Sequence, residues 1–213
     1  MADDVKSRAA KIVVRLKKEY PDAGCSLSYK TAHQLLVATI LSAQTADEQV
    51  NKITPELFRK YRTIEDFAGA DVAGLEEAIR SMGLYRNKAK AIKTSAVQLL
   101  HEFGGRMPDT LDGMLKLSGV GRKTASVVLG TWYGKAEGIV VDTHVLRLSQ
   151  LLGFTRHKNP DKIEKDLMQI IARKDWIILT HLLIDHGRAV CMARRPRCEV
   201  CALNRLCPSA LHS

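Results

Sequence analysis

Four of the five cysteines lie close together near the C-terminal end of the sequence. Cys191, Cys198, Cys201 and Cys207 have the spacing C-x6-C-x2-C-x5-C, whereas Cys25 stands alone. In a reducing compartment such a group is more often a metal site than a pair of disulfides. Four thiolates are ligands for a soft metal, and their spacing leaves both tetrahedral zinc and an iron-sulfur cluster open.

A second pattern combines closely spaced glycines with basic residues, in Leu117-Ser-Gly-Val-Gly-Arg-Lys-Thr-Ala125. Gly119 and Gly121 permit positive φ and a close approach of the backbone, directly before a predicted helix whose first N–H groups have no internal partner. Such a turn can bind a phosphate. A tight turn between two packed helices would use the same glycines, so the pattern alone is a weak signal.

Lys123 stands in the first turn of that predicted helix, where acidic residues are usually preferred. The positive end of the helix dipole and the neighbouring Arg122 are expected to lower the pKa of this lysine below its ordinary value of about 10.4. A lysine with a lowered pKa is an amine nucleophile. The alternative role is a solvated contact with a phosphate.

Asp142 is the carboxylate that could act with this lysine. It follows an apolar run and precedes another predicted helix, in Val140-Val-Asp-Thr-His144. The local pattern is typical of a helix N-cap aspartate. The functional interpretation makes Asp142 the carboxylate opposite Lys123.

The overall charge favours a polyanionic partner. The 213 residues include 33 Lys and Arg against 23 Asp and Glu, a net charge of +10. A polyanion such as nucleic acid is the leading candidate for the partner. Ribosomal proteins and other RNA-binding proteins share such an excess of positive charge. No apolar stretch is long enough to span a membrane and no secretory signal is visible, so we expect a cytoplasmic, nucleoid-associated protein.

The elements that position these residues are predicted to be helices. Apolar residues recur at helical spacing almost everywhere, and strand-like alternation is nearly absent, so the sequence predicts an all-α fold. A helix over 87–103 would turn Lys88, Lys90 and Lys93 to its polar side. Two helices joined at 118–121 form a helix-hairpin-helix pattern. The other expected helices cover 5–16, 33–42, 47–61, a short segment after Thr63, 75–82, 143–152, 160–172 and 175–186.

Taken together, these motifs resemble the endonuclease III branch of the helix-hairpin-helix DNA glycosylases. The matching segments span most of the chain: Leu41-Ser-Ala-Gln44, Gly83-Leu-Tyr85, Asn87-Lys-Ala89, Gly119 to Ala125, Val141-Asp-Thr-His144, His186-Gly-Arg188 and the four-cysteine loop. Two positions depart from the family pattern. Ser118 stands where the hairpin usually has proline, and Ala46 interrupts a polar pair after Gln44.

The resemblance implies two helical domains with a DNA-binding cleft between them. Residues 24–135 would be a six-helix barrel domain with the helix-hairpin-helix motif. Residues 1–23 and 136–213 would form a discontinuous iron-sulfur cluster domain. A [4Fe-4S] cluster would be ligated by Cys191, Cys198, Cys201 and Cys207, in a structural and DNA-binding role.

The resemblance also implies an activity. The protein would be a monomeric base-excision-repair glycosylase that removes oxidised pyrimidines, such as thymine glycol, from double-stranded DNA. Lys123 would form a Schiff base with the sugar, so that β-elimination at the abasic site follows as an AP lyase activity. Asp142 would stabilise the developing charge or help to deprotonate the lysine.

Other residues are expected to contact the DNA. Leu84 would be an apolar wedge and Gln44 a polar filler of the space that a flipped base leaves. Leu84 could instead be plain core or surface, and Gln44 a helix-end residue. The remaining expected contacts are Gly119, Val120, Gly121, Arg122, Thr124, His144, Arg147, Arg194 and Arg195.

Two other functions stay open. A monofunctional mismatch adenine glycosylase shares the fold, the aspartate and the cluster, but it carries a non-amine residue where this chain has Lys123, and here no further recognition domain is expected after Ser213. A catalytically silent DNA-binding module with a metal-clamped loop would bind DNA without a covalent intermediate.

Overall fold

The computed structural model describes residues 2–210, and over that range the chain forms helices and turns without a strand. The predicted all-α fold is therefore confirmed. The chain divides into two compact units. Ser26–Lys135 form one, here called the hairpin unit, and Met1–Cys25 with Ala136–Ser213 form the other, here called the cysteine unit. None of the helices described is long and apolar enough to cross a membrane.

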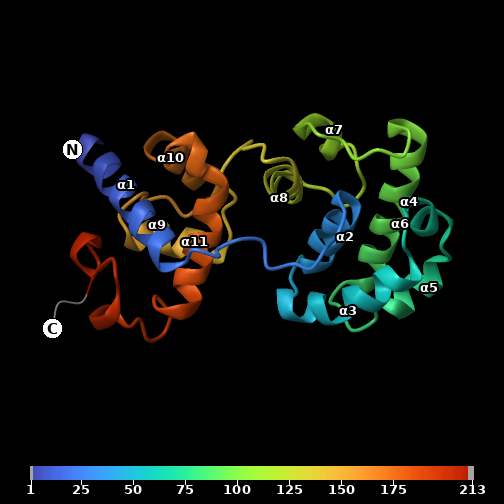
Figure 1. The fold of residues 1–213 in the computed structure, drawn as a ribbon, viewed down its shortest axis with the longest axis horizontal. Helices are drawn as coiled ribbons and strands as arrows, with labels where there is room; N and C mark the ends of the chain where they lie inside the picture. Colours follow the sequence, from blue (N-terminus) through green and yellow to red (C-terminus); the bar gives the residue numbers. More distant parts are fainter. Residues whose placement is uncertain (1, 211–213) are drawn as a thin grey trace. The chain divides into compact units, whose positions relative to one another are not determined.

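The hairpin unit is built around a buried central helix, α2 (Ala32–Ser42), which contacts α3, α6 and α8. Leu35, Leu36, Val37 and Leu41 of this helix are fully buried, as expected for a helix that is apolar on all sides. The other helices of the unit are α3 (Asp47–Lys60), α4 (Ile64–Gly69), α5 (Val72–Ala78), α6 (Tyr85–Phe103), α7 (Leu111–Leu115) and α8 (Arg122–Tyr133) (Figure 1).

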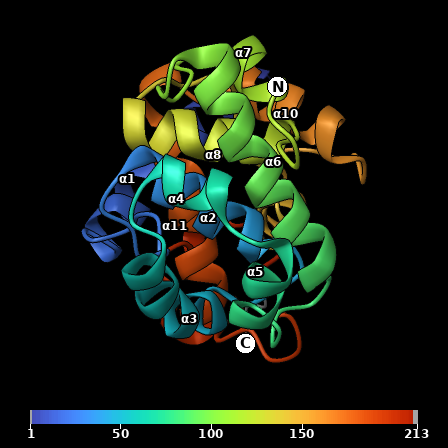
Figure 2. The same ribbon diagram turned by 90° about the vertical axis from the view of Figure 1, so that its right-hand side faces the viewer.

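The cysteine unit joins the N-terminal helix to the C-terminal part of the chain. Its α-helices are α1 (Ala2–Glu19), α9 (Thr143–Leu151), α10 (Pro160–Ile170) and α11 (Trp176–Ala189), with 3-10 turns at Arg173–Asp175, Cys198–Val200 and Asn204–Leu206. Helix α1 packs against α11, as Figures 1 and 2 show. Leu203 of the cysteine loop is fully buried in the same core as Ile12 and Leu16 of α1. The loop is therefore part of the fold and not an appendage.

The helix ends show where local patterns are reliable. The predicted short helix after Thr63 is confirmed as α4, and the side chains of Thr63 and Asp66 form a reciprocal capping box at its start. The predicted start at Pro160 is confirmed as well, with Asn159 as the cap. Helix α5 ends at Ala78, earlier than predicted, and Ile79 and Met82 are buried in the turns that follow it.

Candidate active site and cysteine centre

The two glycines of the hairpin have different structural roles. Gly119 has φ +75°, and a Cβ atom there would lie 2.6 Å from the Cβ of Ala91 on α6. Only glycine therefore fits this position. Gly121 has φ −90°, and no atom lies within 4 Å of the place a Cβ would take. The fold requires Gly119, whereas Gly121 leaves open space at the start of α8.

A side chain from α6 holds the hairpin turn in place. The Gln98 side chain donates through Nε2 to the carbonyl oxygen of Lys116 at 2.9 Å, and its Oε1 accepts from the N–H of Ser118 at 2.7 Å. Proline at 118 has no N–H and would not make the second bond. The departure from the family pattern at Ser118 thus comes with a hydrogen bond to a neighbouring helix. Nothing in the local sequence singled out Gln98.

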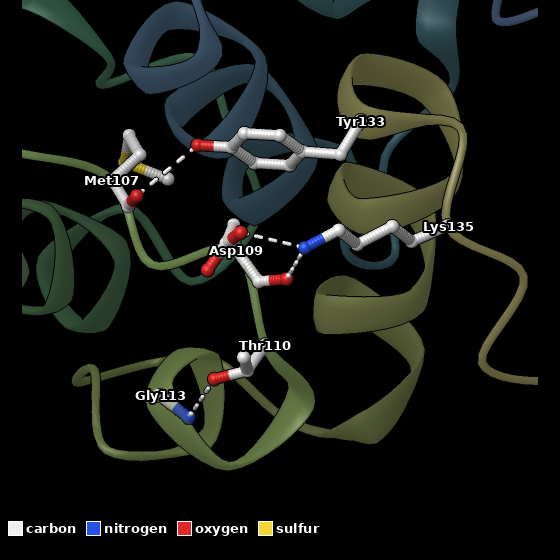
Figure 3. Close-up of polar contacts among 6 residues, drawn as sticks. All are labelled: Met107, Asp109, Thr110, Gly113, Tyr133 and Lys135. Carbon is white, nitrogen blue, oxygen red and sulfur yellow. Dashed lines mark hydrogen bonds and ion pairs between the residues drawn. The ribbon is translucent and has the colours of Figure 1, made fainter.

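Polar contacts also anchor the far end of the hairpin, where α8 finishes (Figure 3). The hydroxyl of Tyr133 donates to the carbonyl oxygen of Met107 at 3.1 Å. Lys135 Nζ donates to the carbonyl oxygen of Asp109 at 2.7 Å and to its Oδ2 at 2.6 Å. This lysine lowers the pKa of the Asp109 carboxyl group. The turn of the hairpin and the end of α8 are therefore each tied to residues outside the hairpin.

The N-terminus of α8 is left without a side-chain cap. Gly121 is the N-cap residue, no acidic residue lies in the first turn, and Gly121, Arg122 and Lys123 are all exposed. Thr124 is half-buried, and the Val120 side chain is buried, so Val120 can face a ligand only through its backbone. N–H groups without a side-chain cap, beside two cationic side chains, suit an anion. The same turn presents the Lys123 amine to solvent.

Asp142 is the N-cap of α9, as its sequence context predicted. Its Oδ1 accepts a hydrogen bond from the N–H of Val145 at 2.8 Å. Oδ2 makes no hydrogen bond or ion pair with the residues described, so one carboxylate oxygen is available to a ligand. The side chain is half-buried. Asp142 belongs to the cysteine unit and Lys123 to the hairpin unit.

Gln44 and Leu84 share an unusual backbone conformation. Their φ angles are +56° and +58°, and no other non-glycine residue in 2–210 has a positive φ. For a side chain such as leucine this left-handed conformation costs about 1–2 kcal/mol. Leu84 is 56 % exposed, so the alternative of a plain core residue is wrong. The two strained positions are the ones predicted as the wedge and the filler.

Lys88 is not on the polar face of α6, where the sequence placed it. Its side chain is only 5 % exposed, and burial lowers its pKa. Its Nζ donates to the carbonyl oxygen of Leu41 at 2.8 Å and to Thr45 Oγ1 at 2.9 Å. The prediction was wrong because a long lysine stem can follow apolar surface to a distant acceptor, which periodicity cannot reveal. Lys90 is exposed as predicted, and Lys93 is half-buried.

The four clustered cysteines line one cavity of about 210 Å³ in the cysteine unit, with mostly apolar walls that include Leu148, Leu151 and Leu203. Burial raises the pKa of the Cys201 and Cys207 thiols, and the neighbouring cysteines raise both further. The tertiary structure thus brings together all four residues that the spacing selected, and Cys25 is not among the residues that line this cavity.

The geometry of the cysteines bears on what they can bind. Within residues 2–210, no three His, Cys, Asp or Glu side chains converge as they would around a single metal ion. Four thiolates are a donor set for either a tetrahedral zinc ion or an iron-sulfur cluster.

Polar groups surround the sulfur atoms. Arg147 Nη1 donates to Cys191 Sγ at 3.7 Å, and the N–H of Leu203 donates to Cys201 Sγ at 3.4 Å. His186 Nε2 lies 3.5 Å from Cys201 Sγ, while its Nδ1 lies 3.0 Å from the hydroxyl of Tyr20. With Tyr20 as the donor to Nδ1, the other ring nitrogen carries the proton that faces sulfur.

The pKa values of this pair agree with a neutral ring. Burial, with a smaller contribution from Arg147, lowers the pKa of His186 to about 4. Burial also raises the pKa of Tyr20 to about 12, so its hydroxyl keeps its proton. Sequence reasoning included His186 only within a matching segment, and it found no signal for Tyr20.

The remaining predicted contacts fall into two groups. Arg194 and Arg195 are exposed in the loop between Cys191 and Cys198, where they can meet a ligand. His144 instead packs on α11, since a Cβ at Gly187 would lie 2.6 Å from its Nδ1. That nitrogen is buried without a hydrogen-bond partner. Arg147, as noted, contacts the cysteine site.

Comparison with known proteins identifies the family. Residues 37–173 match the model of the HhH-GPD superfamily, described as base excision DNA repair proteins. The chain is 51 % identical to endonuclease III of Synechocystis sp. over 96 % of this chain and 94 % of that protein. It is 43 % identical to endonuclease III of Bacillus subtilis over 88 % of this chain and 86 % of that protein.

A solved structure gives the same result in three dimensions. A trapped covalent intermediate of an endonuclease III with DNA superposes with a TM-score of 0.89 at 42 % identity, covering 96 % of each chain. The protein described here therefore belongs to the HhH-GPD superfamily of base excision DNA repair proteins and, within it, to the endonuclease III family.

Proposed function

We propose that this protein is a base-excision-repair DNA glycosylase that removes oxidised pyrimidines from duplex DNA and then nicks the strand as an AP lyase. Membership of the endonuclease III family supports the class of enzyme and DNA as its partner. The observation that carries the proposal is Lys123, an exposed amine in an uncapped first turn without acidic residues. A monofunctional glycosylase would have no use for an amine at this position.

We assign the two compact units to the two proposed domains, with the first boundary two residues later than expected. The hairpin unit is assigned as the barrel domain with the helix-hairpin-helix motif, although it has seven helices, α2 to α8, where the resemblance implied six. The cysteine unit is assigned as the iron-sulfur cluster domain. In the hairpin, the N–H groups at the start of α8 would bind a backbone phosphate, with Arg122 and Thr124 beside them. The open space at Gly121 lets a phosphate approach the backbone.

Catalysis begins once the damaged nucleotide has left the base stack. The neutral amine of Lys123 attacks C1′ of the deoxyribose, an N–C1′ bond forms, and the bond from C1′ to the base breaks. The base leaves with the bonding electron pair and takes up a proton. Asp142 would stabilise the positive charge on the sugar through its available oxygen, or accept a proton from the lysine.

Strand cleavage uses the same covalent intermediate. Opening of the sugar ring gives a Schiff base between Lys123 and C1′, which acidifies the protons on C2′. Loss of one such proton drives β-elimination, in which the C3′–O bond breaks and the 3′ phosphate departs. Water then hydrolyses the Schiff base and regenerates the lysine. Base removal and nicking therefore both depend on one amine.

The other DNA contacts follow from exposure and conformation. Leu84 and Gln44, which are exposed and held in strained conformations, would occupy the space that the flipped nucleotide leaves. Arg194 and Arg195 would contact backbone phosphates. His144 and Arg147 would act less directly, since one packs on α11 and the other donates to Cys191.

The cysteine cavity is proposed to hold a [4Fe-4S] cluster ligated by Cys191, Cys198, Cys201 and Cys207. The four-thiolate donor set, the cavity that all four cysteines line and membership of the endonuclease III family support this assignment. When bound, the cluster would stiffen the loop that carries Arg194 and Arg195. We further propose that the protein acts as a monomer in the cytoplasm, associated with the nucleoid.

Borohydride trapping tests the proposed chemistry. Wild type, Lys123→Gln and Asp142→Asn are each incubated with a duplex that contains one thymine glycol, and the imine is reduced. We expect a covalent adduct with wild type and none with Lys123→Gln, although that variant still binds DNA. An adduct that persists in Lys123→Gln would rule out Lys123 as the nucleophile. Base release by wild type without any adduct would point to a monofunctional glycosylase.

Metal analysis tests the cluster. Anaerobically purified wild type should be yellow-brown with about four iron atoms per chain, the stoichiometry of a four-cysteine cubane cluster. Cys198→Ser should lose the colour, whereas Cys25→Ser should keep it and serves as the matched control. Colourless protein that contains zinc would contradict the assignment.

A further inference from the structure

Lys88 is a buried cation that the proposed mechanism does not use. It lies near the start of α6 with 5 % of its surface exposed, and no acidic group among residues 2–210 is paired with it. Its Nζ is satisfied by two neutral oxygens, the carbonyl of Leu41 at 2.8 Å and the hydroxyl of Thr45 at 2.9 Å. Burying an ammonium group without a counter-ion costs free energy, so the buried position of this lysine calls for a reason.

The first acceptor lies at the C-terminal end of α2. Leu41 is in the last turn, where carbonyl oxygens have no partner inside the helix and carry the negative end of the helix dipole. The second acceptor, Thr45, follows Gln44 directly. Lys88 therefore forms hydrogen bonds to residues before and after Gln44, in the turn where Gln44 has a positive φ.

The same lysine also belongs to the turn that follows Leu84. Leu84 is the N-cap of α6, and its carbonyl oxygen accepts from the backbone N–H of Lys88 at 3.0 Å. The Lys88 side chain thus fastens the start of α6 to the end of α2. Gln44 and Leu84, the two non-glycine residues with positive φ in the described chain, thus belong to the two turns that Lys88 joins.

We propose that Lys88 is a positioning residue that holds Gln44 and Leu84 together in their strained conformations, ready to fill the space left by a flipped nucleotide. The inference rests on the proposed function, because it assigns that task to Gln44 and Leu84. Strained conformations persist only where the surrounding structure enforces them. Lys88 would hold these two conformations from the protein interior, without contacting the DNA itself.

Lys88→Met tests the proposal, because methionine keeps an unbranched stem and removes the three donors. Lys93→Met is the matched control, since Lys93 lies on the same helix and donates to the carbonyl oxygen of Ala70 at 2.7 Å, in the connection between α4 and α5. Each variant is assayed for strand cleavage at one abasic site, placed once in a duplex and once in a single strand. A single strand has no opposite base and no continuous stack to fill.

We expect Lys88→Met to lower kcat/KM on the duplex by about 10- to 100-fold, while cleavage of the single strand stays close to wild type. Lys93→Met should leave the ratio of the two rates unchanged. The fluorescence of 2-aminopurine placed opposite the abasic site should rise on binding wild type and rise much less on binding Lys88→Met. These readouts follow the filling of the stack and would not respond to a loss of stability alone.

Two results would overturn the proposal: an unchanged ratio of the two rates in Lys88→Met, whether or not both rates fall, or the same selective loss on the duplex in Lys93→Met. If Lys88→Met does not fold, Thr45→Val carries the test, because it removes only the bond beside Gln44 and should give a smaller loss confined to the duplex. A Thr45→Val variant with wild-type rates on both substrates would then refute the idea. Failure of the proposed function is distinguishable, since wild type itself would then cleave neither substrate.

Discussion

The two helices that begin beside a proposed catalytic residue start in opposite ways. Helix α9 is capped by Asp142, whose Oδ1 accepts from the N–H of Val145. Helix α8 has Gly121 at the same position, no side-chain cap, and cations in its first turn. A capped end is stabilised and fixes its carboxylate in one orientation. An uncapped end leaves its N–H groups, and the positive end of its dipole, for a ligand.

The start of α9 thus contributes to stability, whereas the start of α8 remains available for binding. At α9 one residue serves as both cap and proposed catalytic carboxylate, so stability and chemistry coincide. At α8 the helix gives up the stabilisation of a cap, and the donors remain available to a phosphate. Substitutions at the two ends should therefore change different properties.

The largest effect is expected at Lys123. Lys123→Arg keeps a cation at the start of α8 but removes the neutral amine, because arginine does not lose its proton in proteins. Nicking of a thymine glycol duplex should fall by about three orders of magnitude or more. Affinity for the same duplex, measured by fluorescence anisotropy, should remain close to that of wild type. Substantial nicking by Lys123→Arg would show that the charge and not the nucleophile is what matters here.

Two substitutions of Asp142 should separate its role as a helix cap from its proposed role in catalysis. Asparagine caps a helix about as well as aspartate, so Asp142→Asn should melt close to wild type but lose about 10²- to 10⁴-fold in single-turnover rate. Asp142→Ala should lose a similar factor in rate and, in addition, about 1 kcal/mol of the free energy of unfolding in urea. If Asp142→Asn retains the full rate, the aspartate is only a cap.

The two glycines of the hairpin should differ in stability. Gly119→Ala places a Cβ at positive φ and against Ala91, so we expect a loss of at least about 1–2 kcal/mol. Gly121→Ala meets no neighbouring atom and should lose less, no more than about 1 kcal/mol, because its only penalty is that alanine is a poorer N-cap than glycine. Urea denaturation followed by circular dichroism measures both. Equal losses would contradict the distinct roles assigned to these glycines.

The smallest effect on stability is expected from giving α8 the cap it lacks. Gly121→Asp should stabilise the protein by a few tenths of a kcal/mol, since aspartate is only slightly better than glycine as an N-cap. The same change should weaken DNA binding, because a carboxylate would then occupy the place proposed for a phosphate. Affinity titrations at several salt concentrations measure this. Unchanged affinity would remove the start of α8 from the proposed DNA contacts.

Much of the fold and of the candidate site could be predicted because the signals are local. Caps at Thr63, Asn159 and Asp142 depend on residues three or four positions away, and the structure has all three. The glycine spacing in the hairpin and the cysteine spacing likewise lie within short segments. Helix ends were less accurate, as at α5, because the burial of Ile79 and Met82 depends on packing against other helices.

The polar network behind the site could not be predicted in the same way. Lys88 reaches acceptors 47 and 43 residues away, and Tyr20 reaches His186 across 166 residues. Gln98 supports the hairpin from 20 residues away. Helical periodicity assigns a side chain to a face of its own helix, and it carries no information about which acceptor another helix places there.

The sequence by itself determined the helical fold class, the hairpin, the four-cysteine donor set and the choice of Lys123 and Asp142 as candidates, because each follows from residue chemistry and short-range spacing. Only the tertiary structure decided that Lys88 is buried, that Gln44 and Leu84 adopt positive φ, and that the four cysteines line one cavity. The reason is physical: burial and backbone strain are set by packing between segments that are distant in the chain. The type of a residue limits the chemistry that it can perform, and packing against distant segments determines whether its side chain is positioned for that chemistry.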